Sequence, residues 1–91
     1  MLRDFFDGER LRRIPAQRKK RVVVLRKLLE RFERGRTYSE REVNELLGRA
    51  HEDVATLRRE LVMYGFMERE RGVYRVAEQP PEYSRNVLQE L

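Results

Sequence analysis

The sequence predicts a mainly α-helical domain with a small β-hairpin, in the order of a winged helix-turn-helix: three helices and then a two-stranded wing. Apolar residues recur every three or four positions in three stretches and alternate at every second position in a fourth. A capping residue or a glycine stands at the expected ends of these stretches. A chain of 91 residues forms one domain with a small core. We expect an N-terminal arm or small hairpin over residues 1–15, the winged helix-turn-helix domain over residues 16–77, and a tail over residues 78–91.

The chain from Phe5 to Leu11 combines two aromatic residues with an Asp-Gly turn signal, and predicts a small hairpin or an extended arm. Pro15 then stands at a position where a helix can begin, and Gly35 marks a stop. The periodicity between them predicts the first helix from Ala16 to about Glu33. Its inward face consists of Val22, Leu25, Leu28, Leu29 and Phe32.

The second helix follows a short β-prone link from Arg36 to Tyr38. Ser39 and Glu42 have the spacing of a capping box, in which the hydroxyl accepts from one unpaired amide and the carboxylate from another. The helix is expected to end near Gly48. Its buried stripe consists of Val43, Leu46, Leu47 and Ala50.

The third helix is predicted to begin after a capping Asp53 and to run through Tyr64, where Gly65 stops it. Its inward residues at helical spacing are Val54, Leu57, Leu61 and Tyr64. A hairpin follows, because apolar and polar residues alternate on both sides of an Arg71-Gly72 turn.

The C-terminal tail begins where Pro80 and Pro81 break regular structure. The segment from Glu82 to Leu91 fits one short helix. Its apolar residues, which are candidates for a homodimer contact, are Tyr83, Val87, Leu88 and Leu91.

Several motifs resemble one bacterial family. They are Leu11–Pro15 (LRRIP), Tyr38–Asn44 (YSEREVN), Asp53–Val62 with its LRRELV, Tyr64–Glu70 (YGFMERE), and Tyr74. Together they are similar to the bacterial domain of unknown function 2087, over about Phe6 to Val76. Similar domains occur alone or joined to helix-turn-helix regulators, and are usually labelled as transcriptional regulators without a demonstrated activity. The resemblance therefore implies the fold and a bacterial source more than any mechanism.

The charge of the chain is unevenly distributed. Basic residues outnumber acidic ones by 21 to 16, giving a net charge of +5. Twelve of the basic residues and only two of the acidic ones lie between Arg10 and Arg36, whereas acidic residues outnumber basic ones after Thr37. Clustered positive charge favours a nucleic acid as partner, because phosphates attract Lys and Arg.

The composition gives no support for an enzyme, a cofactor or a membrane protein. The chain has no Cys and only one His, and it has no glycine-rich phosphate loop. His51, Glu52 and Asp53 are adjacent in a turn and point apart, so a metal site is not expected there. No apolar run approaches the length of a membrane span, and the N-terminus does not resemble a signal peptide. We therefore expect a cytoplasmic protein without cofactor.

The outward face of the third helix is the candidate DNA-contacting surface. It presents Ala55, Thr56, Arg59 and Met63, with Arg58 and Glu60 at its flanks. Thr56 and Arg59 are the candidates for base contacts, because Arg binds guanine O6 and N7 with two donors and Thr can bond a base edge. In the alternative reading, Arg58 or Arg59 pairs with an acid such as Glu42 or Asp53 in a structural network.

Phosphate contacts are expected mainly from the first helix and from the wing. The candidates are Arg18, Lys19, Lys20, Arg21, Arg58 and Arg71. Arg12 and Arg13 extend this basic cluster, while Glu68 and Glu70 weaken the wing. The alternative is a solvated helix face whose charged side chains cover apolar surface.

The favoured function is a double-stranded DNA-binding protein that acts in bacterial transcription, with the third helix in the major groove. One alternative is a protein-protein interaction module on the same scaffold, because Val62 and Met63 are predicted to be exposed. A further alternative is RNA binding through the arginine-rich first helix, although the chain carries no RNA-recognition signature.

Overall fold

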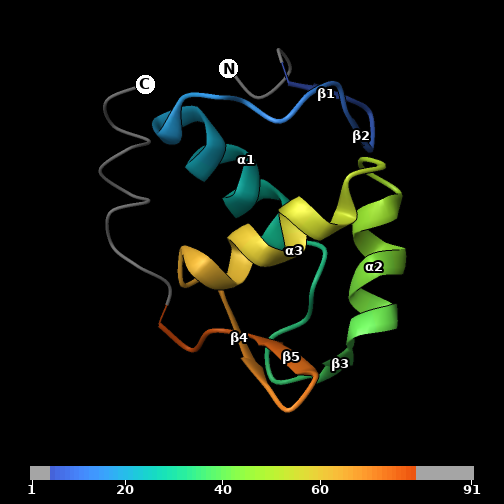
Figure 1. Cartoon of the computed structure of the whole chain (residues 1–91), viewed down its shortest axis with the longest axis vertical. Coiled ribbons are helices and arrows are strands. Elements are labelled where there is room, and N and C mark those ends of the chain that lie inside the picture. The colour runs from blue at the N-terminus through green and yellow to red at the C-terminus, as the bar shows by residue number, and fades with distance from the viewer. Residues whose placement is uncertain (1–4, 80–91) are drawn as a thin grey trace.

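In the computed structural model of the chain, residues 5–79 are described, and they form three helices and five short strands (Figure 1). The elements are β1 (Phe6–Asp7), β2 (Arg10–Leu11), α1 (Arg18–Leu29), β3 (Tyr38–Ser39), α2 (Glu40–Gly48), α3 (Val54–Met63), β4 (Met67–Glu70) and β5 (Val73–Val76). The prediction of a mainly α-helical chain with small antiparallel pairings is confirmed. The predicted tail helix from Glu82 to Leu91 lies outside the described residues.

Near the N-terminus the structure has the hairpin rather than the extended arm. Strands β1 and β2 pair antiparallel, with Phe6 opposite Leu11. Phe5 and Leu11 are buried in the main core, and the Leu11 N–H donates to the Ala50 carbonyl oxygen at 2.7 Å. This hairpin is therefore attached to the end of α2 and shares the core of residues 16–77.

Helix α1 is shorter than the predicted span from Ala16 to Glu33. It begins three residues after Pro15, and its cap residue, Gln17, makes no side-chain capping bond. Beyond Leu29 the N–H groups of Glu30, Arg31 and Phe32 donate to carbonyl oxygens three residues earlier. The chain thus continues in tighter turns, which still bring Phe32 into the core although the regular helix has ended.

The capping signals of α2 and α3 are confirmed. The Glu42 N–H donates to Ser39 Oγ at 3.1 Å, and the Ser39 N–H donates to Glu42 Oε1 at 2.9 Å. Asp53 Oδ1 accepts from the Thr56 N–H at 3.3 Å. Gly65 adopts φ +82° directly after α3, a conformation that favours glycine at a helix end.

The predicted hairpin of β4 and β5 is also confirmed, and a third strand joins it. Arg71 and Gly72 both have positive φ, at 51° and 78°, as a two-residue hairpin turn requires. Strand β3 pairs antiparallel with β5, with Tyr38 opposite Tyr74, so the strand order is β3-β5-β4. The sequence predicted only a β-prone link at this place, because its pairing partner lies far along the chain.

The core lies between the three helices and the sheet. Helix α3 crosses in front of α1, and the β4–β5 hairpin projects from the end of α3 (Figure 1). The predicted inward residues that are buried are Val22, Leu25, Leu28, Phe32, Val43, Leu47, Ala50, Leu57 and Leu61. The other residues that were predicted to face inward are only half-buried and pack against the core from its edge; they are Leu29, Leu46, Val54 and Tyr64.

Glu60 corrects the predicted faces of α3. Helical periodicity predicted it at the flank of the outward face, but only 6% of Glu60 is exposed. Arg21 Nη1 of α1 donates to Glu60 Oε1 at 2.8 Å, while Arg21 Nε donates to the Pro15 carbonyl oxygen at 2.9 Å. The carboxylate can face inward because α1 supplies this partner at the contact between the two helices.

Removal of the Arg21 guanidinium is expected to destabilise the fold strongly. Arg21→Met leaves the Glu60 carboxylate buried without its partner, which costs about 3 kcal/mol of unfolding free energy. Urea denaturation of the variant and the wild type measures this difference. The double variant Arg21→Met/Glu60→Leu should recover most of the loss, since both charges are then gone. Equal stability of Arg21→Met and the wild type would contradict the role of the pair.

The capping box should make stability depend on pH in the acid range. The backbone hydrogen bond from Ser39, followed by its side-chain bond and the nearby charge of Arg36, lowers the pKa of Glu42. A lowered pKa in the folded state means that the stabilisation is complete above the ordinary value of about 4.3 and is lost as the pH falls through the lowered pKa. Glu42→Gln should therefore flatten the fall in stability between about pH 5 and pH 3. A fall as steep as that of the wild type in thermal denaturation would exclude this contribution.

Candidate nucleic-acid interface

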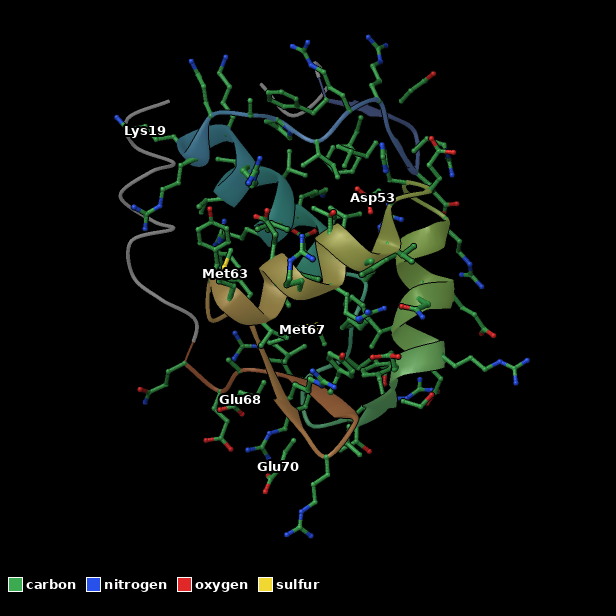
Figure 2. All side chains as sticks on the ribbon, in the orientation of Figure 1. Lys19, Asp53, Met63, Met67, Glu68 and Glu70 are labelled. Carbon is green, nitrogen blue, oxygen red and sulfur yellow. The ribbon has the colours of Figure 1, made fainter. Side chains whose placement is uncertain are left out.

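Helix α3 presents a narrow outward stripe of three side chains spaced four residues apart. Ala55, Arg59 and Met63 are all exposed, and Met63 retains 64% of its surface. Leu57 and Leu61 face the core on the opposite side of the helix. Figure 2 shows Asp53 and Met63 at opposite ends of α3. The stripe therefore follows the outer side of α3 for most of its length.

The two predicted base-contacting residues differ in their exposure. The Arg59 side chain is exposed and makes no hydrogen bond or ion pair within residues 5–79. Thr56 is half-buried, and its backbone N–H belongs to the cap formed by Asp53. The side-chain and backbone hydrogen bonds from Thr56 hold the pKa of Asp53 below its ordinary value, and the charge of Arg59 adds to this effect.

Arg58 takes part in a network that joins α3 to α2 and the sheet. Its guanidinium donates to Asn44 Oδ1 of α2 and lies 3.7 Å from Glu40 Oε1. The Tyr74 hydroxyl of β5 donates to the same Glu40 oxygen at 3.1 Å. Arg58 therefore belongs to a structural network, as the alternative reading predicted. The acidic residue that it pairs with is Glu40, and not Glu42 or Asp53.

A groove of about 400 Å³ separates α3 from the β4–β5 hairpin. Its lining residues are Ala55, Arg58, Arg59, Val62, Met63, Arg69 and Tyr74. The Arg69 guanidinium lies 5.8 Å from the centre of the Tyr74 ring, a distance typical of a cation–π contact. The groove therefore combines apolar side chains from α3 with arginines from both of its sides.

The β4–β5 hairpin carries mixed charge. Arg71 is exposed at the turn and has no hydrogen-bond or ion-pair partner among the described residues. Arg75 Nε donates to Glu68 Oε1 directly across the two strands at 2.8 Å. The Glu68 and Glu70 side chains project away from the sheet in Figure 2. Glu70 is exposed and has no ion-pair partner in the described part of the chain, so the hairpin offers Arg71 at its tip and an unneutralised acid beside it.

The predicted basic cluster of α1 separates into different environments. Arg18 and Lys19 are exposed at the start of the helix, where Figure 2 shows Lys19, and the Arg18 guanidinium lies 5.9 Å from the centre of the Tyr64 ring. Lys20 is half-buried. Arg21 faces α3, where Glu60 holds it. The sequence therefore grouped four neighbours that the helix distributes around its circumference.

Arg12 and Arg13, on the segment that leads into α1, are exposed. Neither side chain forms a hydrogen bond or an ion pair with the described chain. They add two uncompensated charges to the basic half of the molecule.

The candidate metal cluster at residues 51–53 has a simpler role. His51 Nδ1 accepts from the Asp53 N–H at 3.0 Å, which shapes the turn before α3. Over residues 5–79 no group of three or more His, Asp and Glu side chains is arranged to hold a metal ion. Within the same range, each helix is too short or too polar to cross a membrane.

The inward position of Glu60 is the functional feature that sequence reasoning missed. A signal for it exists, because Glu60 follows Leu57 by three residues and precedes Tyr64 by four, the spacing of the inward face. An acid at such a position requires a cation from another element, and α1 supplies the pairing residue.

Comparison with known families identifies the chain. The profile of a family described as uncharacterized proteins conserved in bacteria (DUF2087) matches residues 10–76. The chain belongs to this family. The match of this DUF2087 chain runs from β2 to the end of β5, and so includes α3, its outward stripe and the Arg21–Glu60 pair. No curated protein and no solved structure matches the chain.

Proposed function

We propose that the chain is a winged helix-turn-helix protein that binds double-stranded DNA and acts in bacterial transcription. The element order supports this reading, because α2 and α3 are joined by a short turn and the β4–β5 hairpin follows as the wing. The observation that carries the proposal is Arg59, an exposed guanidinium without hydrogen-bond or ion-pair partner in residues 5–79, on the outer side of α3. Such a group suits the major groove, where Arg is the most frequent base-contacting side chain.

Phosphate contacts in this proposal come from exposed or half-exposed cations on both sides of α3. They are Arg12, Arg13, Arg18, Lys19, Lys20 and Arg71. Arg21 and Arg58 are assigned to internal networks instead, because Glu60 holds the former and Asn44 and Glu40 hold the latter. A protein with this arrangement gains affinity through release of counterions from the duplex, so its binding should depend strongly on salt.

A second candidate function, the binding of a protein partner, is favoured by one observation. Met63 exposes 64% of its surface beside the apolar part of the α3–hairpin groove, and an exposed apolar side chain suits a protein partner. The dependence of binding on salt concentration distinguishes DNA binding from protein binding. Binding through phosphates weakens by orders of magnitude with added salt, whereas an apolar protein interface changes little.

Fluorescence anisotropy with a labelled random-sequence duplex tests the DNA proposal. With about five phosphate contacts, the affinity should fall a few hundredfold between about 50 and 200 mM salt. The triple variant Arg12→Gln/Arg13→Gln/Lys20→Gln should bind more weakly and show a shallower salt dependence, because three phosphate partners are gone. Arg59→Ala should weaken binding further at any salt concentration.

The matched control is Arg41→Ala, which removes one positive charge from the solvent-facing side of α2, where Arg41 pairs with Glu45 at 3.3 Å. It should bind as the wild type does. A duplex RNA of the same sequence should bind more weakly than the DNA, because the deep, narrow major groove of A-form RNA excludes a helix. Absence of DNA binding at low salt would refute the proposal, and so would an equal preference for the RNA.

The acidic residue at the proposed wing should reduce DNA affinity. Glu70→Gln removes an exposed negative charge that has no ion-pair partner in the described chain, so binding of the random duplex should tighten about twofold to fivefold at low salt. The gain should shrink at high salt because of screening. Glu33→Gln makes the same change of charge in the chain that follows α1 and should have a smaller effect. An equal gain in both variants would indicate that net charge alone is responsible, and not the position of the hairpin.

A further inference from the structure

We infer that the outward stripe of α3 gives the protein a base preference: a guanine contacted by Arg59, with thymine methyl groups on both sides contacted by Ala55 and Met63. This inference rests on the proposed function, because it requires α3 to lie in the major groove. It goes beyond that function by stating which chemical groups of the DNA bases are recognised. The recognised groups are the O6 and N7 acceptors of guanine and the C5-methyl group of thymine.

The spacing of the stripe matches the spacing of base pairs. Ala55, Arg59 and Met63 follow each other at four-residue intervals, so about 6 Å of helix axis separates each from the next. Base pairs along one strand repeat every 3.4 Å or so, and two steps therefore span roughly 7 Å. When α3 lies along the groove, each apolar side chain meets a position about two base pairs from the one that Arg59 contacts.

Arg59 is the cation of α3 that is available for a base. The helix carries two arginines, and Arg58 is already held by Asn44 and Glu40. Across the groove, Arg69 stacks on the Tyr74 ring of its own sheet. The Arg59 guanidinium makes no hydrogen bond in residues 5–79, so it can present two parallel donors to one guanine without breaking a contact of the fold.

The other two residues of the stripe have no polar group to offer. Met63 exposes its thioether chain and Ala55 its methyl group, and Val62 and Tyr74 continue the apolar lining of the groove beside them. An apolar side chain in the major groove gains free energy by covering the methyl group of thymine, which cytosine lacks. Thr56 is half-buried at the edge of this stripe and is therefore ranked behind these residues as a base contact.

Selection from a pool of random duplexes identifies the preferred sequence. The enriched duplexes should contain a guanine with a thymine about two base pairs away on each side, on either strand. Arg59→Ala should abolish the enrichment of guanine, and Met63→Ser, which leaves no apolar group there, should abolish that of one thymine. Thr56→Val, a control of nearly unchanged shape, should retain the pattern.

Modified bases then test each contact atom by atom in the selected duplex. Replacement of the guanine by 7-deazaguanine removes the N7 acceptor and should weaken wild-type binding about tenfold, within the range for an Arg–guanine pair. Replacement of a thymine by deoxyuridine removes only the methyl group and should weaken binding about fourfold, since one methyl is worth roughly 0.8 kcal/mol. Each effect should disappear in the variant that lacks the contacting side chain, Arg59→Ala or Met63→Ser, because a coupled pair is not additive.

The outcomes separate this inference from the proposed function. Salt-dependent DNA binding without enrichment of guanine and thymine, or base-analogue effects that persist in the variants, overturns the inference and leaves the DNA-binding function standing. Absence of salt-dependent binding overturns both. Since Arg59 and Met63 are exposed and lie outside the core, circular dichroism should show that the variants keep the wild-type fold.

Discussion

The ion pair between Arg21 and Glu60 joins α1 to α3 inside the fold, and together with the buried Leu57 and Leu61 it fixes which side of α3 faces the solvent. Glu60 is almost fully buried, and a buried carboxylate requires a cation at hydrogen-bond distance. Arg21 can fulfil this role because the Pro15 carbonyl oxygen holds its Nε while Nη1 reaches Glu60. With Glu60 fixed against α1, the helical repeat turns Ala55, Arg59 and Met63 outward. The surface to which we assign function thus depends on this polar contact together with the apolar face of α3 that packs in the core.

The distribution of ion pairs says more about function than the net charge of +5. On the α2 side, Arg36 pairs with Glu42 and Arg41 with Glu45, so those charges largely cancel. The segment that leads into α1 has no such compensation at Arg12 and Arg13 among the described residues. Positive charge without an ion-pair partner among the described residues therefore lies just before α1, and the start of α1 approaches the end of α3 where Arg18 lies over the Tyr64 ring. An anionic partner drawn to that region would arrive close to the outward stripe.

Local signals made most of the fold predictable, whereas distant contacts did not. The Ser39–Glu42 box, the Asp53 cap, the Gly65 stop and the Arg71-Gly72 turn each depend on residues within a few positions of one another. The pairing of β3 with β5 joins Tyr38 to Tyr74, and the Glu60 contact joins residues 39 positions apart, so neither follows from a short pattern. The same limit applies to the candidate site. Helical periodicity predicted Arg59 on the outer face, but the engagement of Arg58 depends on Asn44 and Glu40 of another helix.

Arg21 belongs both to the basic cluster of α1 and to the buried ion pair with Glu60, and this limits which variants can test the DNA proposal. Arg21 is a neighbour of Lys19 and Lys20 in the sequence, and its loss removes a positive charge from α1. The same change also leaves Glu60 without its partner and weakens the contact between α1 and α3, so a weaker affinity for DNA would have two physical causes. Arg12, Arg13 and Lys20 lack such a contact within residues 5–79. Their replacement alters the phosphate-facing charge and leaves the position of α3 unchanged, which makes them the informative substitutions.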